Sequence, residues 1–195
     1  MAVIYRAVAG ASNGDIKYPH PESRRLPKNI PYVVDNLWEW SRPAGYADRR
    51  QCAYGSRSPE EARQSGKGEV YALEFLGDHQ LCQLRGYADA KCHPDVHAVK
   101  DAAFNALGGY DWSNRTLAEK SLAGGLYIPG LTAEEVETVL TEAGLTEADM
   151  ESLRAAVGFW GDVTLVEPGE ALPDPKGEIF FTYPDGYVLR ALDSA

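Results

Sequence analysis

The chain has 195 residues, of which 44% are hydrophobic and 25% charged, and it carries a formal net charge of −10. This acidic balance argues against broad electrostatic binding to nucleic acid, and no apolar run is long enough to cross a membrane. Three cysteines without paired spacing argue against a disulfide framework, so we expect a cytoplasmic protein, or one delivered into a target cell without a signal peptide.

The N-terminal segment Ala2–Val8 predicts a short apolar strand that contains Arg6. An arginine in such a strand needs either an acid to pair with or a ligand to bind, and both interpretations stay open. Gly10–Pro31 is polar and rich in turn residues, which predicts a long connection. Val33–Ser41 predicts an amphipathic helix that ends before Pro43.

The segment Cys52–Ala62, CAYGSRSPEEA, predicts a strand that turns directly into a helix. Gly55 ends the strand, Ser58 is the expected N-cap and Glu61 its capping-box partner. Small hydroxyls and backbone N–H groups at such a turn can hold an anion or a ribose.

Several arginines interrupt the acidic composition, at Arg24-Arg25, Arg49-Arg50 and Arg57. They could together hold one phosphate-bearing ligand, but solvated loop arginines are the more common case, and we expect these to be solvated.

Val70–Leu76 and Gln80–Leu84 predict two strands, and Gly77-Asp78 between them predicts a hairpin. Glu69 and Glu74 lie on either side of the core run of the first of these strands and are candidate catalytic carboxylates.

Pro94–Leu107 predicts a helix that two glycines close. Near its start lie Cys92, His93 and His97. Zinc sites usually need four ligands at recurring spacings, and no second pair exists in the sequence, so we expect no metal.

The clearest signals predict two consecutive helices at about residues 131–158. Thr132 and Glu135 predict a capping box, and Thr146 predicts the start of the second helix. We expect this helical hairpin, with its acidic outer faces, to be an insertion that packs on the core.

Near the C-terminus, Asp162–Val166 predicts a strand, and Ile179–Phe181 and Tyr187–Leu192 predict a hairpin with Glu178 at its entrance. Short strands that are separated by turns, and do not alternate with helices, indicate an α+β class.

Three of these motifs, the strand Val3-Ile4-Tyr5-Arg6, the strand–Ser-x-Ser–helix segment and a Glu that opens a late strand, resemble the mono-ADP-ribosyltransferase superfamily. The similarity is greatest to its Arg–Ser–Glu branch, which includes small bacterial toxins. The family's Arg holds NAD, its Ser-x-Ser segment orders the site, and its late Glu engages the ribose hydroxyl. Carried over by motif, these residues are Arg6, Ser56 with Ser58, and Glu178. Tyr54 could stack on nicotinamide.

The resemblance implies one domain over residues 1–195, with an ADP-ribosyltransferase-like split mixed or antiparallel β-sheet core, flanking helices and the inserted helical hairpin. It implies NAD as the substrate, cleaved at its nicotinamide–ribose bond, with ADP-ribose passed to a protein or other macromolecule. Such an enzyme would act as a bacterial toxin or effector, and an immunity or antitoxin protein would be a further partner.

The chain departs from this family in one informative place. Arginine-modifying members carry Glu or Gln two residues before the catalytic Glu, where this chain has Lys176. This departure argues against arginine as the acceptor and leaves water, another side chain or a small molecule open.

Two alternatives predict different sites. A RES-type toxin also consumes NAD and also begins with a Tyr-Arg strand, but its catalytic acid would be Glu69 or Glu74. A non-enzymatic acidic binding protein, similar to an immunity protein, would instead use the charged helical hairpin as its binding face.

Overall fold

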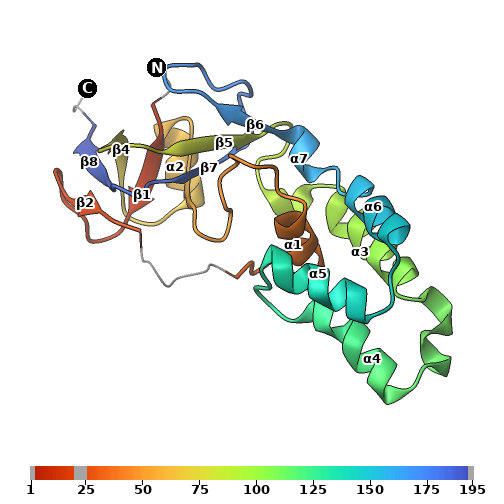
Figure 1. Cartoon of the computed structure of the whole chain (residues 1–195). Helices are drawn as coiled ribbons and strands as arrows, with labels where there is room; N and C mark the ends of the chain where they lie inside the picture. Colours follow the sequence, from red (N-terminus) through yellow and green to blue (C-terminus); the bar gives the residue numbers. More distant parts are fainter. Residues whose placement is uncertain (1–2, 20–25, 193–195) are drawn as a thin grey trace. The chain divides into compact units, whose positions relative to one another are not determined.

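The computed structural model describes residues 3–19 and 26–192, which group into two compact units. The sheet unit consists of the described parts of Met1–Arg25, Gly45–Asp89 and Val163–Ala195, and the helical unit consists of Leu26–Ala44 and Ala90–Asp162. The chain is therefore α+β, as its sequence predicts (Figure 1). The helices expected as an insertion at 131–158 belong to the larger helical unit.

The sheet unit contains two four-stranded sheets, and every strand pair among the described residues is antiparallel. The first sheet has the strand order β1 (Tyr5–Val8), β4 (Glu69–Phe75), β8 (Tyr187–Ala191) and β2 (Ile16–Lys17). The second sheet has the order β3 (Ala53–Gly55), β7 (Glu178–Thr182), β5 (Gln80–Leu84) and β6 (Val163–Val166). Helix α2 (Pro59–Ser65) follows β3.

Both hairpins that we predicted from turn residues are wrong. Strands β4 and β5 lie in different sheets, and so do β7 and β8. The turn before β8 does form, because Gly186, with a φ of 90°, donates a backbone hydrogen bond of 2.9 Å to the carbonyl of Tyr183. A turn reverses the chain without choosing the partner of the next strand. Since β3 and β5 occupy the two edges of β7, β8 instead pairs with β4 and β2.

The two sheets contribute to one hydrophobic core. Alternation along β4 buries Tyr71 and Leu73 and leaves Glu74 exposed, as expected for a strand with one face on the core. Other members of this core come from both sheets and their flanks: Ile4, Ala53, Leu81, Val166, Ile179, Phe181, Tyr187 and Leu189. The core therefore fixes β1, β3 and the start of β7 relative to one another.

The helical unit contains most of the helices. They are α1 (Tyr32–Trp40), α3 (Asp95–Ala106), α4 (Leu117–Gly124), α5 (Ala133–Glu142), α6 (Glu147–Ala155) and α7 (Phe159–Asp162), with 3₁₀ segments η1 (Ala90–Cys92), η2 (Gly109–Asn114) and η3 (Gly125–Tyr127). The helices predicted over 33–41, 94–107 and 131–158 are confirmed within three residues at their ends.

Threonine caps begin α5 and α6. The hydroxyl of Thr132 accepts from the backbone N–H of Glu135 at 3.2 Å, and the Glu135 carboxylate accepts from the Thr132 N–H at 2.7 Å. Thr146 and Asp149 make the same reciprocal pair. Helix α5 packs against α1, and α6 packs against α3, so both helices are built into the core of the helical unit.

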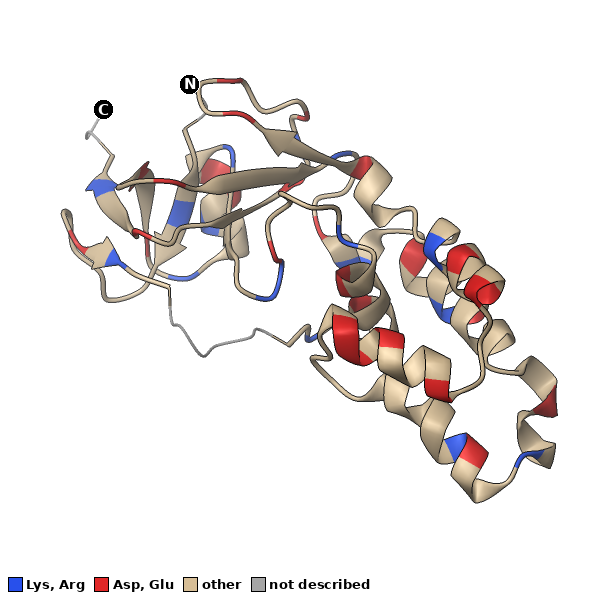
Figure 2. Ribbon diagram, in the orientation of Figure 1, with Lys and Arg blue, Asp and Glu red and all other residues tan. Residues whose placement is uncertain are grey.

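Acidic residues recur along α5 and α6 (Figure 2). The exposed acids of these helices are Glu134, Glu135, Glu142, Glu147, Asp149 and Glu151. Within the described ranges, no helix has both the length and the apolar composition needed to cross a membrane.

Candidate functional site

A pocket of about 730 Å³ lies in the sheet unit, where the two sheets meet. Its walls come from β1, β3, α2 and the start of β7. Four of the five predicted site residues line it, namely Arg6, Tyr54, Ser56 and Glu178, whereas Ser58 does not. The structure thus brings together residues from both ends and the middle of the chain.

The sheets are joined at this pocket by a single bridge between Tyr5 and Ser56. The two residues exchange backbone hydrogen bonds of 2.8 Å in each direction. A Cβ atom on Gly55 would lie 2.3 Å from a methyl carbon of Ile4, so only glycine permits this close approach. The bridge therefore places Arg6, the next residue along β1, beside the Ser56 turn.

Arg6 is half-buried in the pocket wall, and its Nη1 donates a hydrogen bond of 2.8 Å to the phenol oxygen of Tyr187. None of the carboxylates in the described residues forms an ion pair with it. Burial raises the pKa of Tyr187, and the positive charge of Arg6 partly opposes that rise. The salt bridge considered for Arg6 is therefore absent among these residues. The Arg6 guanidinium retains N–H donors for a ligand.

The two serines of the Ser-x-Ser segment have different environments. Ser58 is the N-cap of α2, and its hydroxyl accepts from the backbone N–H of Glu61 at 3.2 Å. The Glu61 carboxylate accepts from the Arg57 N–H and not from that of Ser58, so the predicted capping box is only half formed. Ser56 lines the pocket, and its hydroxyl lies 3.2 Å from that of Ser65. Only Ser56 is placed to touch a ligand.

The backbone before Glu178 is fixed by the side chain of Gln83, which is fully buried on β5. The Gln83 amide donates to the carbonyls of Asp174 (2.9 Å) and Gly177 (3.2 Å), and its oxygen accepts from the Asp174 N–H at 2.9 Å. The Glu178 N–H donates to the carbonyl of Tyr87 at 2.8 Å. These bonds leave little freedom in the segment that presents Glu178.

Asp174 and Gly177 also restrict the backbone of the segment before Glu178. One carboxylate oxygen of Asp174 accepts from the Lys176 N–H at 2.6 Å, and the other accepts from the Gly86 N–H. These backbone donors, that of Lys176 first, lower the pKa of Asp174. A Cβ atom on Gly177 would lie 2.2 Å from the carbonyl oxygen of Leu84, so a side chain cannot be accommodated there.

The Glu178 carboxylate forms an ion pair of 3.4 Å with Arg49. Arg49 and Arg50 are 9% and 4% exposed, so the expectation that these loop arginines are solvated is wrong. Solvation was expected because arginines in loops are more often exposed than buried. No sequence motif indicated Arg49 as a partner of Glu178. Arg24-Arg25 lie outside the described residues.

The rival carboxylates Glu69 and Glu74 do not line this pocket. Glu69 is exposed and accepts a hydrogen bond of 3.0 Å from the phenol of Tyr71. Glu74 is exposed and pairs with Arg190, whose hydrogen bond and charge lower the pKa of Glu74. Neither acid therefore shares a site with Arg6.

Three further charged residues line the pocket and were not singled out as site residues from the sequence: Glu61, Asp89 and Lys176. Each lies in a turn or at a helix start, positions where charged residues are ordinarily solvated. The pocket thus combines cations with carboxylates, and it also offers an aromatic ring from Tyr54 and a hydroxyl from Ser56. Such a lining suits a ligand that carries phosphate, hydroxyl and aromatic groups together.

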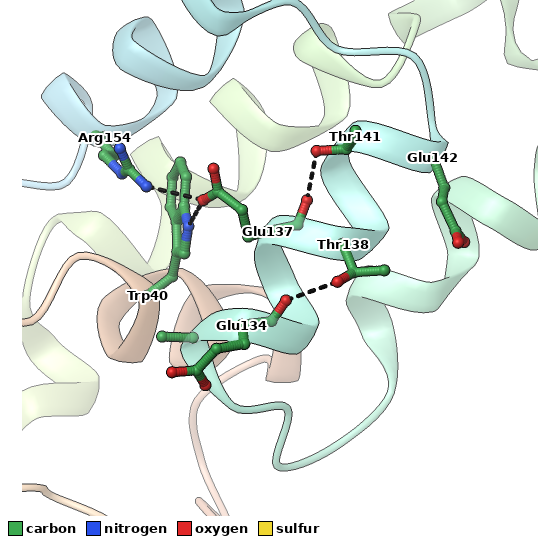
Figure 3. Close-up of a pocket in the computed structure, with 8 residues that line it drawn as sticks. Trp40, Glu134, Glu137, Thr138, Thr141, Glu142 and Arg154 are labelled. Atoms are coloured by element: carbon green, nitrogen blue, oxygen red, sulfur yellow. Dashed lines mark hydrogen bonds and ion pairs between the residues drawn. The ribbon is translucent and has the colours of Figure 1, made fainter.

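The helical unit has a separate open groove of about 600 Å³ (Figure 3). The Glu137 carboxylate accepts hydrogen bonds from the indole N–H of Trp40 at 2.5 Å and from Arg154 at 2.8 Å. The Arg154 guanidinium lies 4.1 Å from the centre of the Trp40 ring. The hydroxyls of Thr138 and Thr141 donate to carbonyls of their own helix. Trp40, Glu137 and Arg154 thus bond to one another, and they fasten α6 to α1 and α5.

His93 is buried, whereas Cys92 and His97 are exposed. Its Nδ1 accepts from the backbone N–H of Asp95 at 3.2 Å, and its Nε2 lies 3.2 Å from the carboxylate of Asp162. Within the described part of the chain, no group of three or more His, Cys, Asp or Glu side chains is arranged so that it could hold a metal ion. The contacts of His93 link the start of α3 to α7 within the helical unit.

Comparison of the chain with protein-family models, with curated proteins and with solved structures finds no match.

Proposed function

We propose that this chain binds NAD in the sheet-unit pocket and breaks its nicotinamide–ribose bond. The observation that carries the proposal is the convergence of Arg6, Tyr54, Ser56 and Glu178 on one pocket of about 730 Å³. That volume lies within the range typical of small-molecule and cofactor sites. The motifs that suggested these residues are far apart in the sequence, so their convergence is an independent support for the family resemblance.

The chemistry requires few groups, and the pocket contains them. The bond between C1′ of the ribose and the nicotinamide nitrogen breaks, and its electron pair goes to the positively charged ring, which leaves as neutral nicotinamide. The ribose becomes an oxocarbenium-like cation, as in glycoside hydrolysis. A carboxylate beside the developing positive charge stabilises it, and Glu178 is the carboxylate we assign to this role.

Arg6 is assigned to the pyrophosphate, because a guanidinium matches the geometry of phosphate oxygens. Ser56 is assigned to the ribose or phosphate oxygens nearby, and Tyr54 to the face of the nicotinamide ring. The incoming nucleophile then bonds to C1′ and gives up its proton, with Glu178 as the acceptor of that proton or of a hydrogen bond from it. Ser58, with its hydroxyl engaged in capping, is no longer assigned a ligand.

The overall arrangement also supports an ADP-ribosyltransferase-like fold, since two antiparallel sheets meet at the pocket and a helix follows the Ser-x-Ser turn. We propose a transferase that passes ADP-ribose to a protein or other macromolecule, in the manner of a bacterial toxin or effector. Lys176, two residues before Glu178, lines the pocket where arginine-modifying relatives have Glu or Gln, so we propose an acceptor other than arginine.

The experiment compares nicotinamide release from NAD by wild type, Glu178→Gln and Glu74→Gln, with cell lysate added as the acceptor. We expect release by wild type and Glu74→Gln, and a loss of about 100-fold or more in Glu178→Gln. The control is matched, because each variant removes one carboxylate from an Arg–Glu pair of the sheet unit. Loss in Glu74→Gln instead would favour the RES-type enzyme, and no release by wild type would favour a binding protein.

A further inference from the structure

The Glu178 carboxylate forms an ion pair with an arginine that does not line the pocket. Arg49 lies 3.4 Å from the Glu178 carboxylate, and the exposed fractions of the two side chains are 10% and 15%. Arg49 is absent from the pocket lining, whereas Glu178 is part of it. Arg49 therefore acts on a ligand through the pocket residues that it contacts, and Glu178 is the charged one among those described.

Two aromatic rings hold the Arg49 guanidinium in place. Its central carbon lies 5.0 Å from the centre of the Phe180 ring and 5.6 Å from that of Tyr54. A guanidinium stacks favourably on aromatic faces, and the attraction grows when water is excluded. The backbone carbonyl of Arg49 also accepts a hydrogen bond of 3.1 Å from the Tyr54 hydroxyl.

The strand register explains why these groups meet. Tyr54 on β3 is the direct antiparallel partner of Phe180 on β7. Glu178 and Phe180 are two residues apart on the same strand, so their side chains leave the sheet on the same face. Arg49 lies against that face and contacts all three side chains.

We infer that Arg49 is a positioning residue that holds the Glu178 carboxylate in its productive orientation. This inference rests on the proposed function. Glutamate has three rotatable side-chain bonds, and a buried charged partner at one fixed point restricts them. Misplacement of a catalytic group by about 1 Å can cost about 100-fold in rate. Loss of Arg49 should therefore slow the chemical step while NAD binding through Arg6 is retained.

The test measures kcat and KM for nicotinamide release by wild type, Arg49→Met, Arg49→Lys and Arg190→Met. Arg190→Met is the matched control, because it removes the arginine of an Arg–Glu pair in the same unit but outside the pocket. We expect kcat to fall about 100-fold in Arg49→Met and at least about tenfold in Arg49→Lys, with KM within about twofold of wild type. Arg190→Met should keep the wild-type values.

A double variant separates positioning from general damage to the fold. Arg49→Met combined with Glu178→Gln should be no slower than Glu178→Gln alone, since both changes disable the same group. If Arg49→Met does not fold, Arg49→Lys replaces it in the comparison, both alone and combined with Glu178→Gln. Folded Arg49 variants with wild-type kcat, or with the loss confined to KM, would overturn the inference while the proposed function stands. Absence of nicotinamide release by wild type would overturn both.

Discussion

Arg6 donates a hydrogen bond of 2.8 Å to the phenol of Tyr187, which begins the strand two places from β1 in the first sheet. Tyr187 is itself buried in the hydrophobic core. The bond links the half-buried guanidinium to the rigid part of the sheet unit, so Arg6 is oriented before any ligand arrives. A preoriented charge loses less entropy on binding than a flexible one.

Replacement of Arg6 by Ala should weaken NAD binding without unfolding the protein. A charge-assisted hydrogen bond contributes about 1.5–3 kcal/mol, so KM for NAD should rise about 10- to 100-fold. The thermal midpoint should fall only modestly, because the variant loses one hydrogen bond, to Tyr187, and no ion pair with a carboxylate among the described residues. Steady-state kinetics and a melting curve measure the two effects, with Arg190→Ala as the control. A large loss of stability with an unchanged KM would instead make Arg6 structural.

Gly177→Ala should destabilise the sheet unit strongly. The added Cβ would lie 2.2 Å from the Leu84 carbonyl oxygen and 2.9 Å from Cγ of Gln83, and backbone atoms on β5 cannot move aside. Overpacking of this kind costs about 1–3 kcal/mol in the free energy of unfolding. Urea denaturation of wild type and Gly177→Ala measures this loss in the free energy of unfolding. Gly161→Ala, where no atom lies within 4 Å of the new methyl group, should be neutral or slightly stabilising. Equal stability of the two variants would contradict the close approach.

The stability contributed by Asp174 should disappear in acid. Backbone hydrogen bonds lower its pKa in the folded protein, so its contribution is present above the unfolded-state value of about 3.9 and is lost as pH falls through the lower folded value. The free energy of unfolding of wild type should therefore exceed that of Asp174→Asn at pH 6, and the difference should shrink below about pH 4. Asp78→Asn, at an exposed position in the loop after β4, is the control and should change the free energy of unfolding little at pH 6. A difference for Asp174→Asn that grows in acid would be inconsistent with these bonds.

Thr132→Ala should destabilise the helical unit by about 1 kcal/mol, because it removes the N-cap of α5 and its capping box. Thr138→Ala is the control on the same helix. Thr138 is exposed and bonds only the carbonyl of Glu134 in its own helix, and alanine favours helix, so this variant should be neutral or stabilising. Thermal unfolding followed by far-ultraviolet circular dichroism compares them. Similar melting temperatures for both variants would show that the cap contributes nothing.

The sequence predicts the local structure well where one residue contacts its neighbours along the chain. The Thr132–Glu135 box, the Ser58 cap and the apolar face of α5 all depend on residues within a few positions of one another. The strands are also predicted, except for β2, which lies in the segment 10–31 that we predicted to be a connection. Each predicted strand is a short apolar run between turn residues. These signals need no knowledge of the tertiary fold.

Strand pairing and the burial of Arg49 could not be predicted in the same way. The Gly186 turn specifies a reversal, but the partners of β7 are decided by β3 and β5, which are distant in the sequence. Arg49 is buried because Phe180 and Tyr54 meet across two strands and Glu178 lies beside them. A motif identifies Glu178 alone, and only the folded chain shows the arginine that accompanies it.

The most direct test of the account is a crystal structure of Glu178→Gln, which should bind NAD without cleaving it, grown with millimolar NAD. The account predicts that the dinucleotide lies in the pocket of the sheet unit, with its pyrophosphate at Arg6 and its nicotinamide ribose within hydrogen-bond distance of Gln at position 178. NAD bound elsewhere, or an empty pocket at that concentration, would contradict the central claim that Arg6, Tyr54, Ser56 and Glu178 form one NAD site.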